Sequence, residues 1–204
     1  MELTYGRYLK VEELLQLQQP LSEGPEHDEM LFIIIHQVYE LWFKQILHEL
    51  EKLKSSFQEG ERGKALHTLK RIRSILKVLV SQVDVLETMT PLEFLSFRER
   101  LQSASGFQSC QFRELEFTLG LKNPKHLEHY PQGSEERNRL EKKMEEPSLW
   151  EVFLQFLSSL GHDSPKLKEG GRSIEPPDSS EDIQDLLEKI YRNHPDSALV
   201  CEML

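Results

Sequence analysis

Hydrophobic residues recur at intervals of three and four along most of the chain, which is the spacing of an amphipathic helix. The longest such stretch predicts a helix over residues 26–60. One stripe of that helix collects His36 with aromatic and aliphatic side chains, namely Phe32, Tyr39, Phe43, Leu47, Leu50 and Phe57. An imidazole on an apolar helix face is commonly a core histidine satisfied by a nearby carbonyl, and the helix alone favours that interpretation.

The neighbouring segments also predict helices. Alternating β-branched runs and Asn-Gly turns, the usual signs of strands and hairpins, do not occur. A short helix is predicted over residues 10–18, ending before Pro20. The helix predicted over residues 63–88 carries a narrow hydrophobic seam suited to antiparallel pairing with the helix before it. The seam consists of Leu69, Ile72, Leu76, Leu79, Val83 and Leu86.

Capping residues mark further helix ends. Thr90, Pro91 and Glu93 have the pattern of a capping box with proline at the first helical position. Gly120 is expected to end a helix. The remaining predicted helices cover residues 91–101, 109–119, 134–145, 148–160 and 181–192, with a loop over 124–133 and a last apolar piece over 199–204.

The chain is long enough for one hydrophobic core, so we expect a single all-α domain, a helical bundle over residues 1–204. The residues 161–180 are polar and contain paired glycines and paired prolines, which predicts a flexible connection. The expected parts are an N-terminal arm (1–25), a helical core (26–120), variable helices (121–160), this connection, and C-terminal helices (181–204).

Composition and charge narrow the class of protein. A formal net charge of −10 argues against nucleic acid as a partner. The two cysteines, Cys110 and Cys201, lie far apart without CxxC spacing, which suits a reducing cytosol. The longest apolar run, residues 30–35, is too short to span a membrane, and residues 1–13 lack the apolar region of a signal peptide. We therefore expect a soluble, cytoplasmic protein with no membrane partner.

Familiar catalytic and metal-binding patterns are missing from the sequence. None of the eight histidines follows a glutamate by three residues, and neither HExxH nor a zinc spacing occurs. A GxSxG elbow and a glycine-rich phosphate loop are also absent.

Phe94 and Arg98 lie one helical turn apart, so an aromatic ring and a guanidinium share a face. The plain interpretation is an arginine that lies over a neighbouring phenylalanine, and in general it is the commoner one. The functional interpretation is an amino-acid site, with an aromatic floor for a side chain and a forked cation for a carboxylate.

Four blocks of sequence, in the same order and at similar spacing, closely resemble the tryptophan 2,3-dioxygenase family. They are LTYGRYL (3–9), EHDEMLFIIIHQVYELWFKQILHEL (26–50), MTPLEFLSFRERL (89–101) and SASGFQSCQFRELE (103–116). The resemblance is strong over residues 3–120 and resumes at 190–192 and 199–202. It makes a functional role for His36 the better interpretation.

The resemblance implies an all-helical, tetrameric, haem b-dependent oxidoreductase. Such an enzyme inserts both atoms of O₂ across the indole C2–C3 bond of L-tryptophan and gives N-formyl-L-kynurenine, the first step of tryptophan catabolism by the kynurenine pathway. His36 is implied as the catalytic residue that meets the indole N–H. Phe94 would flank the substrate, and Arg98 would hold its carboxylate.

The resemblance also implies roles for further residues. Those expected to bind the substrate, besides Phe94 and Arg98, are Phe32, Ile33, Ile34, Ile35 and His36, with Tyr5 and Tyr8 reaching the site of a neighbouring subunit. Ser105 and Gly106 would lie beside the haem, and Arg113 would support that edge.

The family's C-terminal block, with the proximal haem histidine and a glycine- and threonine-rich segment, is not matched here, so no metal ligand is assigned. Three hypotheses stay open at this point. The chain is a shortened dioxygenase whose isolated form turns over little or not at all; it is a haem-free tryptophan-binding module; or it is a helical interaction protein in which the motifs serve packing and assembly.

Overall fold

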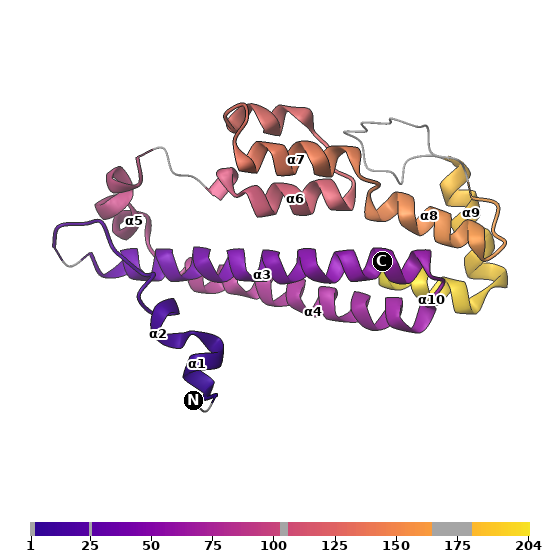
Figure 1. Cartoon of the computed structure of the whole chain (residues 1–204), viewed down its shortest axis with the longest axis horizontal. Helices are drawn as coiled ribbons and strands as arrows, with labels where there is room; N and C mark the ends of the chain where they lie inside the picture. The colour runs from indigo at the N-terminus through magenta and orange to yellow at the C-terminus, as the bar shows by residue number, and fades with distance from the viewer. Residues whose placement is uncertain (1–2, 25, 103–105, 165–180) are drawn as a thin grey trace.

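The computed structural model describes residues 3–24, 26–102, 106–164 and 181–204, and every regular element in these ranges is a helix (Figure 1). The all-α expectation is confirmed. Two long helices, α3 (His27–Gln58) and α4 (Arg62–Leu86), run antiparallel over much of the length of the molecule. The other helices pack on this pair, so its two ends define where the remaining parts lie.

The face shared by α3 and α4 forms the centre of the hydrophobic core. From α3 it buries Ile46, Leu50, Leu53 and Phe57, and from α4 it buries Ala65, Leu69, Ile72, Ile75 and Leu79. Two members of the predicted seam are placed wrongly, because Leu76 is 38% and Val83 40% exposed. A helix can present either residue 75 or residue 76 to a partner one turn after residue 72, and here its rotation selects Ile75.

Helices α6 (Cys110–Leu119) and α8 (Leu149–Ser159) pack on α3, α7 (Glu135–Glu145) packs on α6, and two more helices close the far end of the bundle (Figure 1). These two are α9 (Glu181–Asn193) and α10 (Pro195–Met203). Helix α8 contributes most to the core, since six of its side chains are buried, Phe153 and Leu157 among them. The C-terminal apolar segment predicted over residues 199–204 is part of α10, which begins earlier, with Pro195 in its first turn.

The N-terminal arm differs from the single helix predicted over residues 10–18. It forms two short helices, α1 (Tyr5–Leu9) and α2 (Val11–Leu14). Lys10 has a φ of +55°, a left-handed conformation that no α-helix can continue through, and this residue separates them. Neither helix buries a residue, and the arm projects from the end of the bundle where α3 begins (Figure 1).

The predicted capping box is confirmed at α5 (Pro91–Arg98). The Thr90 hydroxyl accepts from the Glu93 N–H, and the Glu93 carboxylate accepts from the Thr90 N–H. A 3₁₀ turn, η1 (Glu99–Leu101), continues α5, and η2 (Gly106–Gln108) precedes α6. The segment predicted as loop over residues 124–133 contains a further 3₁₀ helix, η3 (Pro124–His129).

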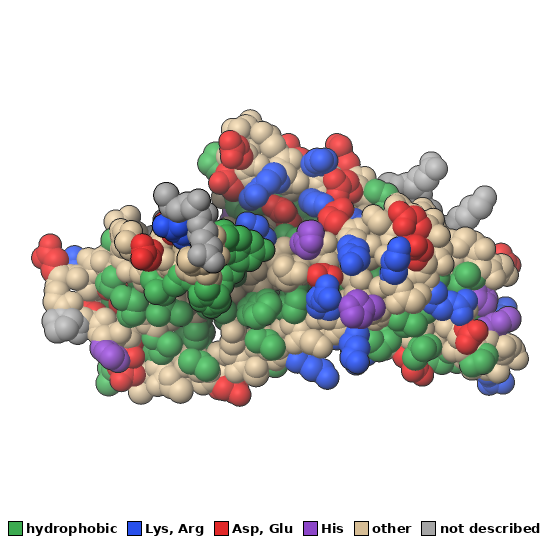
Figure 2. Space-filling model, turned by 60° about the horizontal axis from the view of Figure 1, so that its bottom comes forward, with side chains coloured by type: hydrophobic (Ala, Val, Ile, Leu, Met, Phe, Trp, Pro, Cys, Tyr) green, Lys and Arg blue, Asp and Glu red, His purple; other side chains and the backbone are tan. Residues whose placement is uncertain are grey.

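Hydrophobic and charged side chains are unevenly distributed over the surface. On the face in Figure 2, hydrophobic side chains gather over the left half, and charged side chains dominate the right half. The most exposed large hydrophobic side chains are those of Leu3, Tyr5, Tyr8, Leu15, Val80 and Leu92. None of the described helices is both long and apolar enough to cross a membrane.

Candidate functional site

Three phenylalanine rings pack together where the first turns of α3 meet α5. The Phe32 ring centroid lies 5.8 Å from that of Phe94 and 5.5 Å from that of Phe97. Phe94 and Phe97 meet edge to face at 5.5 Å and 87°. These are favourable aromatic geometries, and they join two helices that are distant in sequence. We call these three residues the aromatic cluster.

His36 lies against this cluster. Its ring centroid is 4.1 Å from that of Phe32, one helical turn earlier, and the side chain is half-buried. Its Nδ1 lies 2.7 Å from the main-chain oxygen of Phe32. A carbonyl oxygen can only accept, so Nδ1 carries the hydrogen, and in a neutral ring Nε2 is then an acceptor. The carbonyl partner of the plain core-histidine interpretation is therefore present, and it leaves Nε2 available.

Phe97 is the site residue that the sequence reasoning missed. Its side chain is 0% exposed, and it is the one buried residue of α5. The signal was available, because Phe94 and Phe97 are three residues apart on a helix whose start is well marked by Thr90. Phe97 fastens α5 to α3 and so sets the position of Phe94.

Arg98 is the last residue of α5, one turn after Phe94, and its side chain is exposed. Its Nη1 donates to the main-chain oxygen of Gln102 at 3.3 Å. A single contact of this length to a neutral acceptor is weak, so the guanidinium can exchange it for a charged partner.

The other residues expected at the substrate are spread around α3 and the arm. Five successive helical residues cover more than one full turn, so the residues 32–36 cannot all face one pocket. The structure brings Phe32 and His36 to the aromatic cluster, whereas Ile35 is buried and Ile34 is 41% exposed. Tyr5 and Tyr8 lie out on the arm and are 78% and 72% exposed.

The residues expected beside a haem lie between α5 and α6. Gly106 is exposed at the start of η2, and Ser105 falls outside the described residues. Arg113 is buried on α6, where Nη1 pairs with the Glu116 carboxylate at 2.6 Å and the guanidinium lies 5.4 Å from the centre of the Phe112 ring. Burial, assisted by the charge of Arg113, lowers the pKa of nearby His126.

A hydrogen-bonded link ties α6 to α3 near His36. The Gln111 amide donates to the Glu40 main-chain oxygen at 3.0 Å and to the Glu40 carboxylate at 2.7 Å. Glu40 lies one turn after His36, so this link sets where α6 stands relative to the imidazole.

Comparison with known proteins identifies the family of the chain. The sequence profile of the tryptophan 2,3-dioxygenase family matches residues 1–192. The chain belongs to the tryptophan 2,3-dioxygenase family. It is 52% identical over 202 residues to the tryptophan 2,3-dioxygenase of Herpetosiphon aurantiacus, covering 99% of this chain and 77% of that protein. It is 51% identical over 201 residues to that of Anaeromyxobacter sp., covering 98% of this chain and 74% of the relative.

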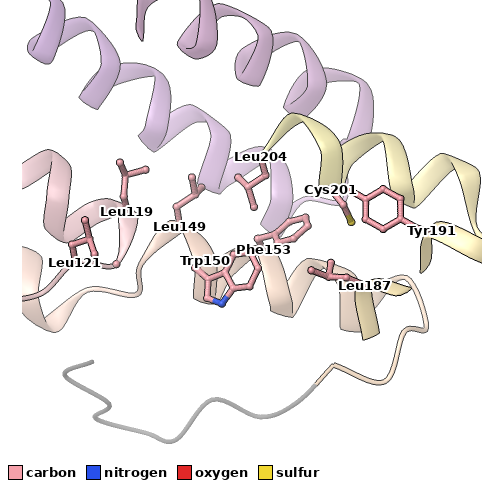
Figure 3. Close-up of a pocket in the computed structure, with 10 residues that line it drawn as sticks. Leu119, Leu121, Leu149, Trp150, Phe153, Leu187, Tyr191, Cys201 and Leu204 are labelled. Atoms are coloured by element: carbon pink, nitrogen blue, oxygen red, sulfur yellow. The ribbon is translucent and has the colours of Figure 1, made fainter. Parts of the chain in front are cut away.

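This tryptophan 2,3-dioxygenase family member has a cavity away from the aromatic cluster. It measures about 410 Å³ and lies between the end of α6 and helices α8, α9 and α10 (Figure 3). Side chains of Leu119, Leu149, Trp150, Phe153, Leu187 and Tyr191 are among those that line it, and none of the lining side chains that the structure describes is charged. The described side chains there offer no ion-pair partner to a zwitterionic amino acid.

The tryptophan 2,3-dioxygenase family is haem-dependent. Within the described ranges, no three His, Cys, Asp or Glu side chains are grouped so as to hold a metal ion. Other described imidazoles contact protein groups: the His67 ring contacts Arg71, and the His162 ring contacts His194 and Ser197. The described residues identify no axial ligand for a haem.

Proposed function

We propose that this chain binds L-tryptophan between His36 and Arg98 and serves the oxidative opening of its indole ring by O₂ to N-formyl-L-kynurenine. The observation that carries the proposal is the half-buried His36 imidazole packed against the aromatic cluster. Arg98 lies one helical turn after Phe94 of that cluster. Membership of a family whose relatives are named tryptophan 2,3-dioxygenase supports it.

His36 has the chemistry to recognise an indole. Its Nδ1–H is engaged by the Phe32 carbonyl, which fixes the ring orientation and makes Nε2 of the neutral ring the acceptor. An indole N–H is a donor only, so it pairs with Nε2 without placing a charge in an apolar pocket. Phe32 and Phe94 supply the flat apolar surface for the indole ring. His36 thereby orients the substrate and holds its N–H proton.

Arg98 has the chemistry to hold the carboxylate of an amino acid. Its guanidinium can donate two parallel hydrogen bonds to a carboxylate, which a lysine cannot reproduce. The weak contact to the Gln102 carbonyl is the one that such a ligand replaces. Since the described residues identify no axial ligand, we derive no step through haem.

The remaining assignments belong to the same proposal. Gly106 and Arg113 border the haem edge, and the ion pair between Arg113 and Glu116 supports it. Tyr5 and Tyr8 act on a neighbouring copy in a homo-oligomer, which their exposure on a projecting arm supports. The absence of a disulfide between the free thiols Cys110 and Cys201 suits a cytoplasmic location.

Calorimetric titration with L-tryptophan, with and without added haem, tests the proposal. Replacing Arg98 with Ala should weaken binding by at least about thirtyfold, or roughly 2 kcal/mol, as expected when one partner of a charge pair is removed. Arg98→Lys should restore only part of that loss. Arg100→Ala is the matched control, because Arg100 is an exposed arginine of the neighbouring turn and should leave affinity unchanged.

His36 is tested in the same titration. His36→Phe keeps an aromatic ring but removes the hydrogen-bond acceptor. This variant should therefore bind tryptophan more weakly than the wild type does, while its affinity for 1-methyltryptophan, which lacks the indole N–H, should be retained. Near-normal tryptophan affinity in both Arg98→Ala and His36→Phe would refute the site. Binding of tryptophan without haem would favour the haem-free module instead.

A further inference from the structure

The root of the N-terminal arm is fastened to α3 by a buried carboxylate. Glu29 is 1% exposed although it is charged, and it lies in the first turn of α3. Its Oε1 accepts from the Leu21 N–H at 2.7 Å, and its Oε2 accepts from the Ser22 N–H at 3.1 Å. We call these two hydrogen bonds, with their three residues, the arm clamp.

A buried carboxylate is costly unless its oxygens are satisfied, and the clamp satisfies both with main-chain donors. The arrangement is specific, because each N–H meets a different oxygen and the two residues must keep a fixed orientation. The clamp therefore sets the direction of the backbone at residues 21–22 as well as its position.

A second attachment lies further along the same helix. The Gln37 amide donates to the Leu17 main-chain oxygen at 3.0 Å, and its oxygen accepts from the Gln18 amide at 2.5 Å. Glu29 and Gln37 are separated by about two helical turns, or roughly 12 Å. The segment 17–22 is thus held on the stretch of α3 that carries Phe32 and His36.

Beyond this fastened segment, residues 3–16 of the arm include no buried residue. Helices α1 and α2 expose two tyrosines and two leucines, and they project away from the bundle (Figure 1). A projecting arm with apolar side chains reaches a defined target only if its root is held rigidly.

We propose that Glu29 is a positioning residue, whose carboxylate aims the N-terminal arm so that Tyr5 and Tyr8 are delivered to a second copy of this chain. The clamp itself is independent of tryptophan chemistry; only the delivery of the arm to a neighbouring copy rests on the proposed function. The clamp also lies one turn before Phe32, so the root of the arm and the candidate site share one rigid helix.

Amide hydrogen exchange at residue resolution, on the full chain, tests the clamp directly. Glu29→Ala should speed exchange at the Leu21 and Ser22 amides by about tenfold or more, because hydrogen bonds to a charged acceptor are lost. Glu29→Gln keeps the size of the side chain but offers one acceptor oxygen, so its effect should be smaller. This variant keeps the test open should Glu29→Ala fold poorly.

Asp28→Asn is the matched control. Asp28 is the other acidic residue of the same helical turn, and among the described residues it makes no hydrogen bond to the arm. Substitution of either Glu29 or Asp28 removes a carboxylate that interacts favourably with the N-terminus of α3. Only substitution of Glu29 should also release the arm. Equal exchange in Glu29→Ala and wild type, or equal acceleration in Asp28→Asn, would overturn the proposal.

Sedimentation velocity tests whether the clamp aims the arm. Glu29→Ala should weaken self-association at least about tenfold relative to Asp28→Asn. The two variants are compared at a temperature at which both are folded. Faster exchange at residues 21–22 with unchanged self-association would overturn the role in delivery. Titration with L-tryptophan separates this result from the proposed function, because Arg98→Ala should lose tryptophan affinity while the exchange of Leu21 and Ser22 stays normal.

Discussion

Replacing Phe97 with alanine removes the one buried side chain of α5, which is the part of the molecule that carries Phe94 and Arg98. Truncation of a fully buried phenylalanine costs about 3–5 kcal/mol of unfolding free energy. Part of that loss comes from the edge-to-face contacts with Phe32 and Phe94, at about 0.5–1.5 kcal/mol each. For a chain of this size, the midpoint of thermal unfolding should fall by about 6–20 °C.

Urea unfolding followed by circular dichroism measures the loss, and amide exchange locates it. Exchange should accelerate in α5, because the helix loses its anchor on α3. L-tryptophan affinity should fall with it, since Phe94 and Arg98 are no longer held. Leu95→Ala is the control on the same helix, where a 60% exposed side chain should cost less than about 0.5 kcal/mol. A loss below about 1 kcal/mol for Phe97→Ala, or an equal loss for Leu95→Ala, would refute the anchoring role.

Three further outcomes are expected. Gly120 ends α6 with a φ of +117°, so Gly120→Ala should destabilise the protein by about 1–3 kcal/mol in urea unfolding, whereas Gly63→Ala, in helix α4, should stabilise it by up to about 1 kcal/mol. Burial raises the pKa of both Cys110 and Cys201 to about 11, so their reaction with a thiol reagent at pH 8 should be about a hundredfold slower than that of a free cysteine and should recover in urea. Burial of Glu29 raises its pKa, but hydrogen bonds from Leu21 and Ser22 outweigh this and the net pKa is lowered. The stability from this carboxylate is present above the unfolded pKa of about 4.3 and is lost as pH falls through the folded pKa, so the difference in unfolding free energy between wild type and Glu29→Gln should shrink below about pH 4 and persist at pH 7.

Helix positions were largely readable from local patterns. Thr90, Pro91 and Glu93 predict the start of α5 because a capping box is a contact between residues three apart. Gly120 predicts the end of α6 for a similarly local reason, since glycine adopts a positive φ without strain. The break at Lys10 was not readable, because lysine has no preference for the left-handed conformation that it adopts there.

The candidate site was only partly readable. The resemblance pointed to His36, Phe94 and Arg98, and helical spacing explains why Phe94 and Arg98 share a face. Spacing along one helix does not say what packs against it, so the contact of Phe32 with Phe97 could not be derived from either helix alone. Whether the assigned residues bind tryptophan as proposed stays a prediction for the titrations.

The sequence by itself determined that the chain is helical, where most helices begin and end, and which family it belongs to, because these properties depend on neighbours a few residues apart or on the order of residues itself. Only the tertiary structure decided that Ile75 rather than Leu76 enters the core, that Phe97 anchors α5, and that Glu29 holds Leu21 and Ser22. Each of these depends on the rotation of one helix against another. That rotation follows from how the whole set of side chains packs, so no single segment encodes it.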